Sequence, residues 1–318
     1  MNRAKVSGST PKSPRKNRLG RLLTAMVTPF DDGGEVDYAQ ARRLALALLN
    51  SGSDGVVVAG TTGESPTLSL DERLRLFAEV KSAVGNRGAV VAGTGNNDTR
   101  ESREFTREAE KIGVDACLLV VPYYNRPTQE GLFEHFSAIA RSTNLPCIIY
   151  NVPSRTVTNL AADTTIRLSR IDNVVGVKEA SGNLGQIAEI IQGTKEDFLV
   201  YSGNDGDTYP ILALGGYGII SVASHLVGLQ IKDMIDRFLE GKFLEAAGLH
   251  RRLLPIVNAL FVLSNPVPLK WALNYVGFPV GKPRLPLVEP DEKSAGIIKD
   301  ALKNHKIDLP IPGSNSRS

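Results

Sequence analysis

The stretch VVGVKEASG, residues 174–182, shows the pattern that decides the fold: an apolar run that stops abruptly at charged and small polar residues. A strand that is apolar on both faces is typical of a parallel sheet that helices cover on both sides. Seven other short runs have the same character. They span residues 22–30, 55–60, 89–95, 116–122, 146–153, 198–203 and 218–224. Together with the run at 174–180, they predict eight parallel strands.

Amphipathic segments between these runs predict helices. The first four cover residues 38–50, 70–84, 99–111 and 130–141. Each begins at or just after a residue that can cap a helix N-terminus, namely Asp37, Ser69, Asp98 or Thr128. Gly52, Gly85 and Gly113 stand where helices should end. Eight strand–helix units in succession favour a closed TIM (β/α)8 barrel, because no Gly-rich dinucleotide turn follows the first strand.

The chain has more helical segments after the eighth strand than a barrel alone needs. They cover residues 231–239, 243–263, 266–276 and 292–303. We therefore expect a small C-terminal helical appendage and no independent second domain. The expected organisation is a disordered basic tail at 1–18, the barrel at 19–228, the last barrel helix with the C-terminal helices at 229–312, and a polar tail at 313–318.

Basic residues are concentrated at the N-terminus. The first 21 of the 318 residues hold seven Lys or Arg and no acid, so the formal net charge of +3 becomes −4 without them. This tail is rich in Ser, Pro and Gly and cannot bury enough apolar surface to fold alone. It indicates a solvated extension, with a nucleic-acid-binding arm or an organelle transit segment as the alternatives. Apart from the tail, nothing predicts binding to nucleic acid.

The composition disfavours membrane, metal and secreted disulfide proteins. No apolar stretch reaches the roughly 20 residues that cross a bilayer. The four histidines are dispersed without metal-ligand spacing, and no phosphate loop is present, so we expect neither a metal nor a cofactor. Cys117 and Cys147 lie in apolar runs and predict buried free thiols, which favours a reducing, cytoplasmic location.

Lys178 is the strongest chemical signal in the sequence. Active sites of TIM barrels lie at the C-terminal ends of the strands, and Lys178 follows the apolar run 174–177 near such an end. Burial favours the uncharged amine, which is the nucleophile that converts a ketone into an imine. An isolated strand lysine more often reaches solvent or pairs with an acid. Tyr150 and Thr61 on the same rim favour the catalytic interpretation.

Other strand ends offer partners for an imine. Tyr150 could shuttle protons, although a strand tyrosine alone is more often a packed aromatic residue. Thr61 and Thr62 could relay a proton and bind a carboxylate, or could be simple turn residues. Arg155 could bind a carboxylate with its guanidinium fork, or form a surface ion pair.

Five segments together resemble the dihydrodipicolinate synthase family of class I pyruvate aldolases. They are GTTGES (60–65), PYYNRPTQEG (122–131), YNVPSRT (150–156), VKEASG (177–182) and GIISV (218–222). The resemblance extends from about residue 22 to residue 310, in order and with matching spacing. It implies that Lys178 forms a Schiff base with pyruvate and that the enamine adds to aspartate 4-semialdehyde. Cyclisation then gives the heterocycle that leads to lysine and diaminopimelate.

The resemblance also implies roles for residues around Lys178. Tyr150 and Thr61 match two members of the family's proton-relay triad, and Tyr124 matches the third, which comes from a neighbouring subunit. The matching substrate-binding positions are Thr62 for the pyruvate carboxylate, Arg155 for the semialdehyde carboxylate, and Gly203 and Ile220 for the pocket lining. A homotetramer built from two tight dimers is implied as well.

The sequence departs from the family at the pocket where feedback-inhibited members bind lysine. The positions that match this pocket are Ser65, Asn97, Glu101 and Tyr123. Leu70 and Arg73 stand where some of those members carry histidines, and Pro66 replaces a smaller residue. Since Arg73 would add a positive charge near a cationic ligand, we expect weak or absent inhibition by lysine.

Two other functions are open at this stage. Sister pyruvate lyases, such as N-acetylneuraminate lyase or 2-keto-3-deoxy sugar acid aldolases, resemble the same barrel and share its lysine and tyrosine. The acceptor side separates them, because the segment VPSRT (152–156) suits a small carboxylated aldehyde, whereas a sugar would require more hydroxyl-binding residues. A non-catalytic binding or regulatory barrel is disfavoured by the intact set of Lys178, Tyr150, Thr61 and Tyr124.

Overall fold

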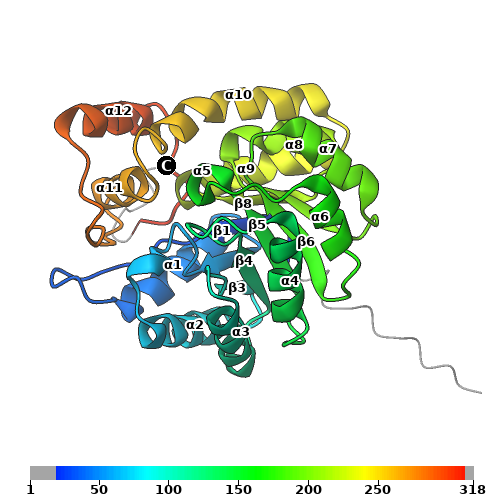
Figure 1. Cartoon of the computed structure of the whole chain (residues 1–318). Coiled ribbons are helices and arrows are strands. Elements are labelled where there is room, and N and C mark those ends of the chain that lie inside the picture. The colour runs from blue at the N-terminus through cyan, green and yellow to red at the C-terminus, as the bar shows by residue number, and fades with distance from the viewer. Residues whose placement is uncertain (1–18, 312–318) are drawn as a thin grey trace, which may run out of the picture.

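The computed structural model describes residues 19–311, and its centre is a closed barrel of eight parallel strands in sequence order (Figure 1). The strands are β1 (Leu22–Ala25), β2 (Gly55–Val58), β3 (Ala89–Gly93), β4 (Ala116–Val120), β5 (Cys147–Asn151), β6 (Val174–Glu179), β7 (Leu199–Ser202) and β8 (Gly218–Ser221). Each is shorter than the run that predicted it, because the apolar residues continue into the following loop. The barrel closes where β1 pairs with β8, with Leu22 opposite Ile219. The predicted TIM barrel is confirmed.

Side chains on each strand alternate between the inside of the barrel and the layer of helices. On β2, Val57 belongs to the inner apolar cluster, whereas Val56 and Val58 belong to the larger cluster that the helices share. Both environments are apolar, so successive residues point to opposite faces without a change of polarity. This arrangement explains why the strands appear in the sequence as continuous apolar runs.

Helices alternate with the strands and surround the barrel. They are α1 (Tyr38–Asn50), α2 (Leu70–Val84), α3 (Thr99–Ile112), α4 (Gln129–Ala140), α6 (Ala162–Leu168), α7 (Leu184–Gly193), α8 (Thr208–Ala213) and α9 (Ser224–Leu239). Three short helices lie in the loops, namely η2 (Ser65–Thr67), α5 (Pro153–Thr156) and η3 (Asp205–Asp207). The four predicted N-caps are confirmed, because the side chains of Asp37, Ser69, Asp98 and Thr128 all accept a backbone hydrogen bond from the first turn. Gly85 and Gly113 end α2 and α3 as expected, whereas Ser51 caps α1 one residue before Gly52.

Helix α9 begins at Ser224, well before the start that the sequence predicts at residue 231. Residues 224–228 are all buried, so this part has no polar face and no amphipathic period. The backbone of Val227 is non-helical and marks a kink between the buried beginning and the amphipathic remainder. The periodicity in the sequence therefore revealed only the second part of the helix.

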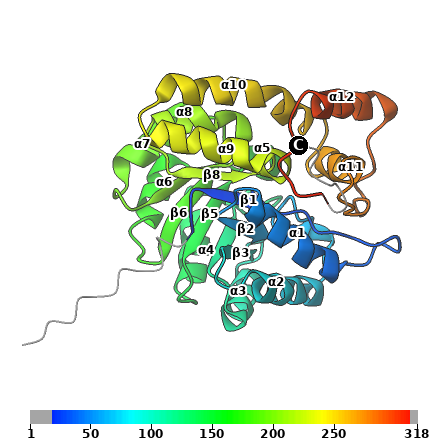
Figure 2. The same ribbon diagram turned by 180° about the vertical axis from the view of Figure 1, so that it is seen from behind.

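The remaining helices are α10 (Phe243–Ala259), α11 (Val267–Tyr275) and α12 (Glu292–Lys303). Helix α10 ends before residue 263, where the sequence predicted its end. Helices α11 and α12, orange and red, form a group at one edge of the molecule in both views (Figures 1 and 2). Leu269 of α11 and Ile298 of α12 share one apolar cluster with Phe30 and Leu44, which belong to the first strand–helix unit. The C-terminal helices thus pack against the barrel itself.

Two predictions concern residues outside the described range, namely the basic tail at 1–18 and the polar tail at 313–318. Within 19–311, no helix has both the length and the apolarity to cross a membrane. Cys117 and Cys147 are buried and free, as predicted. They are opposite each other on β4 and β5, with 3.4 Å between their Sγ atoms.

Candidate active site

Lys178 on β6 and Tyr150 on β5 lie side by side at the C-terminal end of the barrel. Their Cα atoms are partners in the ladder between the two strands. The Nζ atom of Lys178 lies 4.2 Å from the centroid of the Tyr150 ring, and Lys178 is only 5% exposed. Within residues 19–311, no ion pair includes Lys178. Neither exposure to solvent nor pairing with an acid therefore explains this lysine.

Glu179 follows Lys178 in the chain but points to the opposite face, as the alternation along a strand requires. Its carboxylate accepts hydrogen bonds from Asn151 Nδ2 at 3.1 and 3.2 Å and from the backbone N–H of Ser181 at 2.9 Å. Burial raises the pKa of Glu179, and these hydrogen bonds oppose that shift. Asn151 and Glu179 are also partners in the β5–β6 ladder, so their contact supports the register that places Tyr150 beside Lys178.

Gly203, directly after β7, lies against the Lys178 side chain. A Cβ atom at Gly203 would be 3.2 Å from Lys178 Cε and 2.7 Å from the Cβ atom of Ala180. Any larger residue would therefore displace the lysine or its neighbour. Ile220 on β8 is fully buried in the inner cluster of the barrel. Both residues occupy positions that suit the lining of a small pocket.

Asp205 is a buried acid to which the sequence analysis assigned no role. Its carboxylate accepts hydrogen bonds from Ser221 Oγ and from the backbone N–H groups of Val222 at 3.0 Å and Ala223 at 3.3 Å. Burial raises the pKa of Asp205, whereas these hydrogen bonds and the charge of Lys178 lower it. Asp205 thus holds the C-terminal end of β8 and lies close enough to Lys178 for the two charges to interact. In the sequence, this role could have been suspected from an acid two residues after the apolar run 198–203.

The loop after β2 brings a hydroxyl into a buried position. Thr62 is 3% exposed, and its Oγ1 accepts a hydrogen bond of 2.8 Å from Asn265 Nδ2. The loop turns tightly, since Ala59 and Glu64 have positive φ values of 50° and 57°. Thr61 is half-buried in the same turn. Thr62 is therefore more than a generic turn residue, because its buried hydroxyl has a specific partner.

Tyr124 and Arg155 lie on loops that follow β4 and β5. Tyr124 is 90% exposed with a φ of 75°, so it does not join Tyr150 and Thr61 within this chain. Arg155 is exposed, and its Nη2 atom donates to the backbone carbonyl of Asn265 at 3.2 Å. Within the described residues no ion pair includes Arg155, so the surface pairing considered for it is absent.

Glu64 and Lys270 form a buried ion pair that the sequence analysis missed. Their Oε1 and Nζ atoms are 2.7 Å apart, and each side chain is only 1% exposed. Burial lowers the pKa of Lys270 to about 8, against the attraction of Glu64. In the sequence, the pair could have been suspected from a lysine inside an apolar helical segment, because a buried charge needs a partner. Its partner lies more than two hundred residues earlier in the chain, so no local pattern could identify it.

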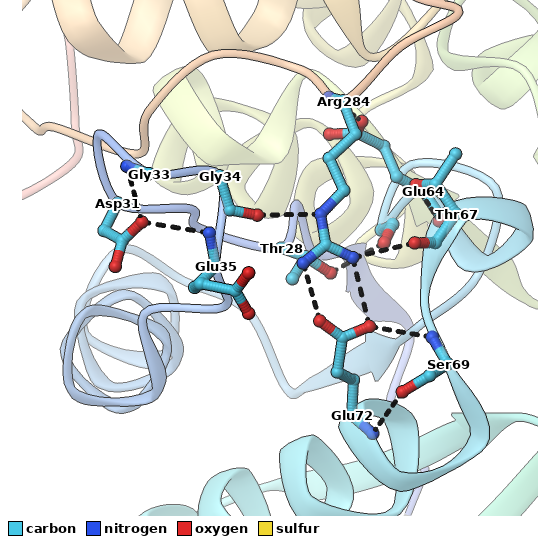
Figure 3. A network of polar contacts seen from close by, with 11 residues as sticks. Thr28, Asp31, Gly33, Gly34, Glu35, Glu64, Thr67, Ser69, Glu72 and Arg284 are labelled. Atoms are coloured by element: carbon cyan, nitrogen blue, oxygen red, sulfur yellow. Dashed lines mark hydrogen bonds and ion pairs between the residues drawn. The ribbon is translucent and has the colours of Figure 1, made fainter.

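Arg284 reaches from the C-terminal segment into the loop that carries Glu64 (Figure 3). Its backbone N–H donates to Glu64 Oε2 at 2.9 Å, and its guanidinium group donates to the carbonyl oxygens of Gly34 and Thr67 at 2.8 and 2.7 Å. The same group binds the Glu72 carboxylate at 2.6 Å and holds the pKa of Glu72 below its usual value. The C-terminal part of the chain thus holds the loop after β2 from two sides.

A cavity of about 530 Å³ lies beside α2 and α3, and three of the positions expected around a lysine pocket line it, whereas Ser65, Pro66, Asn97 and Tyr123 are not among its lining residues. The three are Leu70, Arg73 and Glu101, and Glu104 and Glu108 add two more carboxylates to the lining. Its guanidinium group stacks on the Phe105 ring at 4.3 Å, and its Nε is buried without a hydrogen-bond partner among the described residues. Burial lowers the pKa of Arg73, opposed by the charges of Tyr123 and Glu101. A cationic side chain therefore lies at the cavity.

The groups at this end of the barrel suit the chemistry of a small keto acid. A buried amine, Lys178, lies against a phenol, Tyr150, and a buried hydroxyl and an exposed guanidinium group lie on the neighbouring loops. An amine of this kind can form an imine, and the other groups can bind carboxylates or move protons. Among residues 19–311, no cluster of three or more His, Cys, Asp or Glu side chains could hold a metal ion.

Comparisons with known proteins agree with this chemistry. The profile of the dihydrodipicolinate synthetase family matches residues 18–305. The chain is 64% identical to a 4-hydroxy-tetrahydrodipicolinate synthase of Dehalococcoides mccartyi over 92% of its own length and 99% of the relative. It is 56% identical to the enzyme of that name from Moorella thermoacetica, over 88% and 98% of the two chains. A crystal structure of dihydrodipicolinate synthase from Bacillus anthracis superposes with a TM-score of 0.88 at 46% identity, covering 90% of this chain and 98% of that one. The lysine-bound enzyme from Cyanidioschyzon merolae gives 0.89 at 47% identity, with the same coverage.

Proposed function

The chain belongs to the dihydrodipicolinate synthetase family, and from this premise we propose that it condenses pyruvate with L-aspartate 4-semialdehyde to give 4-hydroxy-tetrahydrodipicolinate. It is then a lyase of lysine and diaminopimelate biosynthesis. The observation that carries this proposal is Lys178, a buried lysine without an ion pair at the mouth of the barrel, with its Nζ 4.2 Å from the Tyr150 ring. A class I aldolase requires an amine in that environment.

Lys178 is the proposed Schiff-base residue. Its uncharged Nζ attacks the C2 carbonyl of pyruvate, and loss of water gives an imine. Removal of a proton from C3 then gives an enamine, which forms a bond to the aldehyde carbon of the semialdehyde. The amino group of the semialdehyde attacks C2, the C2–Nζ bond breaks, and the cyclic product leaves with Lys178 regenerated.

Tyr150 is the proposed proton shuttle. Its ring centroid lies 4.2 Å from the Lys178 Nζ atom, and this closeness supports a role for its hydroxyl in the proton transfers of carbinolamine breakdown and enamine formation. Thr61 on the neighbouring loop and Tyr124 of a second subunit are the proposed partners in this relay. The 90% exposure of Tyr124 supports a role across a subunit interface.

The carboxylates of the two substrates are assigned to different residues. Thr62, a buried hydroxyl, is proposed to bind the pyruvate carboxylate, and Arg155 is proposed to bind that of the semialdehyde in a bidentate manner. Gly203 and Ile220 line the pyruvate pocket, where Gly203 leaves room for the Lys178 side chain. A small carboxylated aldehyde fits these groups better than a sugar does.

The proposed assembly is a homotetramer of two tight dimers, supported by the exposure of Tyr124 and by membership of the family. The proposed location is the cytoplasm, supported by the free thiols of Cys117 and Cys147, which lie within contact distance without forming a disulfide. Size-exclusion chromatography with light scattering measures the assembly, and a dimer or monomer at all concentrations would contradict the tetramer.

The function is tested with purified protein and pyruvate, offered either L-aspartate 4-semialdehyde or N-acetylmannosamine. We expect pyruvate consumption with the semialdehyde alone. Borohydride reduction should add the mass of one reduced pyruvate, and peptide mapping should place it on Lys178. Turnover only with the sugar would make the acceptor assignment wrong, and the absence of any adduct would exclude the Schiff-base mechanism.

A further inference from the structure

Asn265 lies in the segment between α10 and α11 and touches residues of both proposed carboxylate sites. Its side-chain Nδ2 donates to Thr62 Oγ1 at 2.8 Å, and its backbone carbonyl accepts a hydrogen bond from Arg155 at 3.2 Å. On the basis of the function proposed above, we infer that Asn265 is a positioning residue that aims the Thr62 hydroxyl proton at the pyruvate carboxylate. It comes from the C-terminal segment and not from the barrel rim on which the proposed substrate-binding residues lie.

The contact with Thr62 is the main interaction of the Asn265 side chain. Asn265 is 6% exposed, and its Oδ1 is buried without a hydrogen-bond partner among residues 19–311. A buried amide normally satisfies both of its polar ends, because each unsatisfied atom has a free-energy cost. The amide is thus held in a position where its bond to Thr62 is satisfied and its oxygen is not. Because one end of the amide has an energetic cost, a role in orienting the Thr62 hydroxyl explains this arrangement better than a contribution to stability alone.

A hydroxyl group has one proton to donate and two lone pairs that accept. Because the amide donates to Thr62 Oγ1, the threonine cannot direct its own proton at the amide nitrogen. A carboxylate ligand can only accept hydrogen bonds, so it needs a donor. The Thr62 hydroxyl proton is available for it, because the contact with Asn265 uses a lone pair of Oγ1 and not this proton. An amide donor behind the hydroxyl therefore makes Thr62 a donor toward the substrate. It also polarises the hydroxyl and strengthens the bond to an anion.

The position of Asn265 is itself fixed by the buried pair of Glu64 and Lys270. Glu64 lies two residues after Thr62, and Lys270 lies just over one helical turn after Asn265. The pair, with an N–O distance of 2.7 Å, therefore joins the same two segments a second time. Arg284 adds a third link through its backbone N–H, which binds the other carboxylate oxygen of Glu64. Two loops joined at several points have little freedom to change the distance between Asn265 and Thr62.

The test compares the variants Asn265→Asp and Asn265→Ala with wild type. An aspartate at this position accepts the Thr62 proton and adds a negative charge beside the pyruvate carboxylate. We expect the KM for pyruvate to rise at least about tenfold in N265D and about threefold in N265A, where the hydroxyl loses its partner but stays free to rotate. We expect kcat to change by less than about threefold, because the Thr62–carboxylate bond is the same in the ground state and the transition state.

Asn274→Asp is the matched control. Asn274 lies in α11, and its side chain binds the backbone of Gly281 and Val280. The same chemical change there alters the C-terminal segment without touching Thr62 or Arg155, so we expect an unchanged KM for pyruvate. A similar rise in N274D would mean that the effect of N265D is a general weakening of the segment, and would overturn the inference.

A double-mutant cycle with Thr62→Val separates positioning from structure. If Asn265 acts through the Thr62 hydroxyl, N265A has no further effect on the KM for pyruvate once that hydroxyl is absent. A full additional threefold rise in the T62V background contradicts the inference. N265A serves in the cycle because it remains informative even if N265D does not fold.

Borohydride trapping at a series of pyruvate concentrations distinguishes this inference from the proposed function. If wild type forms no adduct, the proposed function fails whatever the variants do. If wild type forms the adduct and N265D reaches half-maximal labelling at the same pyruvate concentration, the function stands and the role of Asn265 is wrong. The expected result is labelling of both proteins, with the half-maximal concentration at least about tenfold higher for N265D.

Discussion

The two sides of the proposed pyruvate site are held in place by different kinds of contact. Lys178 and Tyr150 lie on neighbouring strands, and the ladder between β5 and β6 sets their distance. Thr62 lies on a loop, and its position depends on Asn265 and on the Glu64–Lys270 pair. The proposed nucleophile is thus part of the barrel wall, whereas the proposed carboxylate site is assembled from distant parts of the chain. Substitutions in the C-terminal helices should therefore affect pyruvate binding without removing the nucleophile.

The strand side of this comparison is tested most directly by Lys178→Ala. Removal of the amine should lower kcat by at least about 10⁴-fold, because the proposed imine forms on the Lys178 Nζ atom. Mass spectrometry after borohydride reduction should show no pyruvate adduct. Lys195→Ala, at an exposed position, is the control and should keep both activity and adduct. Substantial remaining activity in K178A would place the Schiff base elsewhere.

Tyr150→Phe tests the second strand residue. Loss of the phenol should lower kcat by about 10²-fold or more, since proton transfer loses its shuttle. The adduct should still form, although more slowly, because Lys178 is intact. Stopped-flow and end-point trapping measure the two effects separately. Tyr209→Phe is the control, because the Tyr209 hydroxyl donates to the backbone carbonyl of Phe243 and lies outside the proposed site. An unchanged kcat in Y150F would remove Tyr150 from the mechanism.

Lys270→Met tests the loop side. The substitution leaves Glu64 as an uncompensated buried charge and should reduce the free energy of unfolding by about 3–5 kcal/mol. The KM for pyruvate should rise in the folded protein, while labelling of Lys178 persists at saturating pyruvate. Urea denaturation and initial-rate kinetics measure the two effects. Lys282→Met is the control, because Lys282 is largely exposed in its pair with Glu289 and its loss should leave the free energy of unfolding nearly unchanged.

The pH dependence of stability should reveal the same pair. Burial lowers the pKa of Lys270 to about 8, from 10.5 for a free side chain. Between these values the unfolded chain binds more protons than the folded one, so this group makes stability rise with pH in that window and leaves it unchanged below. The difference in unfolding free energy between wild type and K270M should therefore grow from pH 8 to pH 10. A constant difference would contradict the lowered pKa.

The smallest expected effect concerns lysine as an inhibitor. Arg73 places a cationic group at the cavity beside α2 and α3, so sub-millimolar lysine should change the rate by less than about twofold. Initial rates with and without lysine test this expectation, and Arg73→His should increase sensitivity if the charge is the cause. Strong inhibition of wild type would show that the cavity tolerates a cationic ligand despite Arg73.

The sequence predicted the strand side of the site much better than the loop side. Apolar runs placed Tyr150 and Lys178 at neighbouring strand ends, and four capping residues located the helices, because these signals depend on residues close together in the chain. Lys270 and Asn265 gave no such signal, since their partners Glu64 and Thr62 are separated from them by more than two hundred residues. The buried start of α9 was not predicted either, because residues 224–228 have no polar face and so show no amphipathic period.

The link between Asn265 and Thr62 has a consequence for the order of synthesis. Ribosomes make the loop with Thr62 early and Asn265 among the last parts of the fold, and most of the barrel sequence emerges between them. A nascent chain that ends before residue 265 already contains Lys178 but lacks Asn265, Lys270 and Arg284, the three residues that hold the loop from the C-terminal side. If Thr62 binds the pyruvate carboxylate as proposed, a chain can therefore complete this site only when its translation is nearly finished. A reactive amine in an unfinished chain lacks the carboxylate site that would bring the keto acid to it.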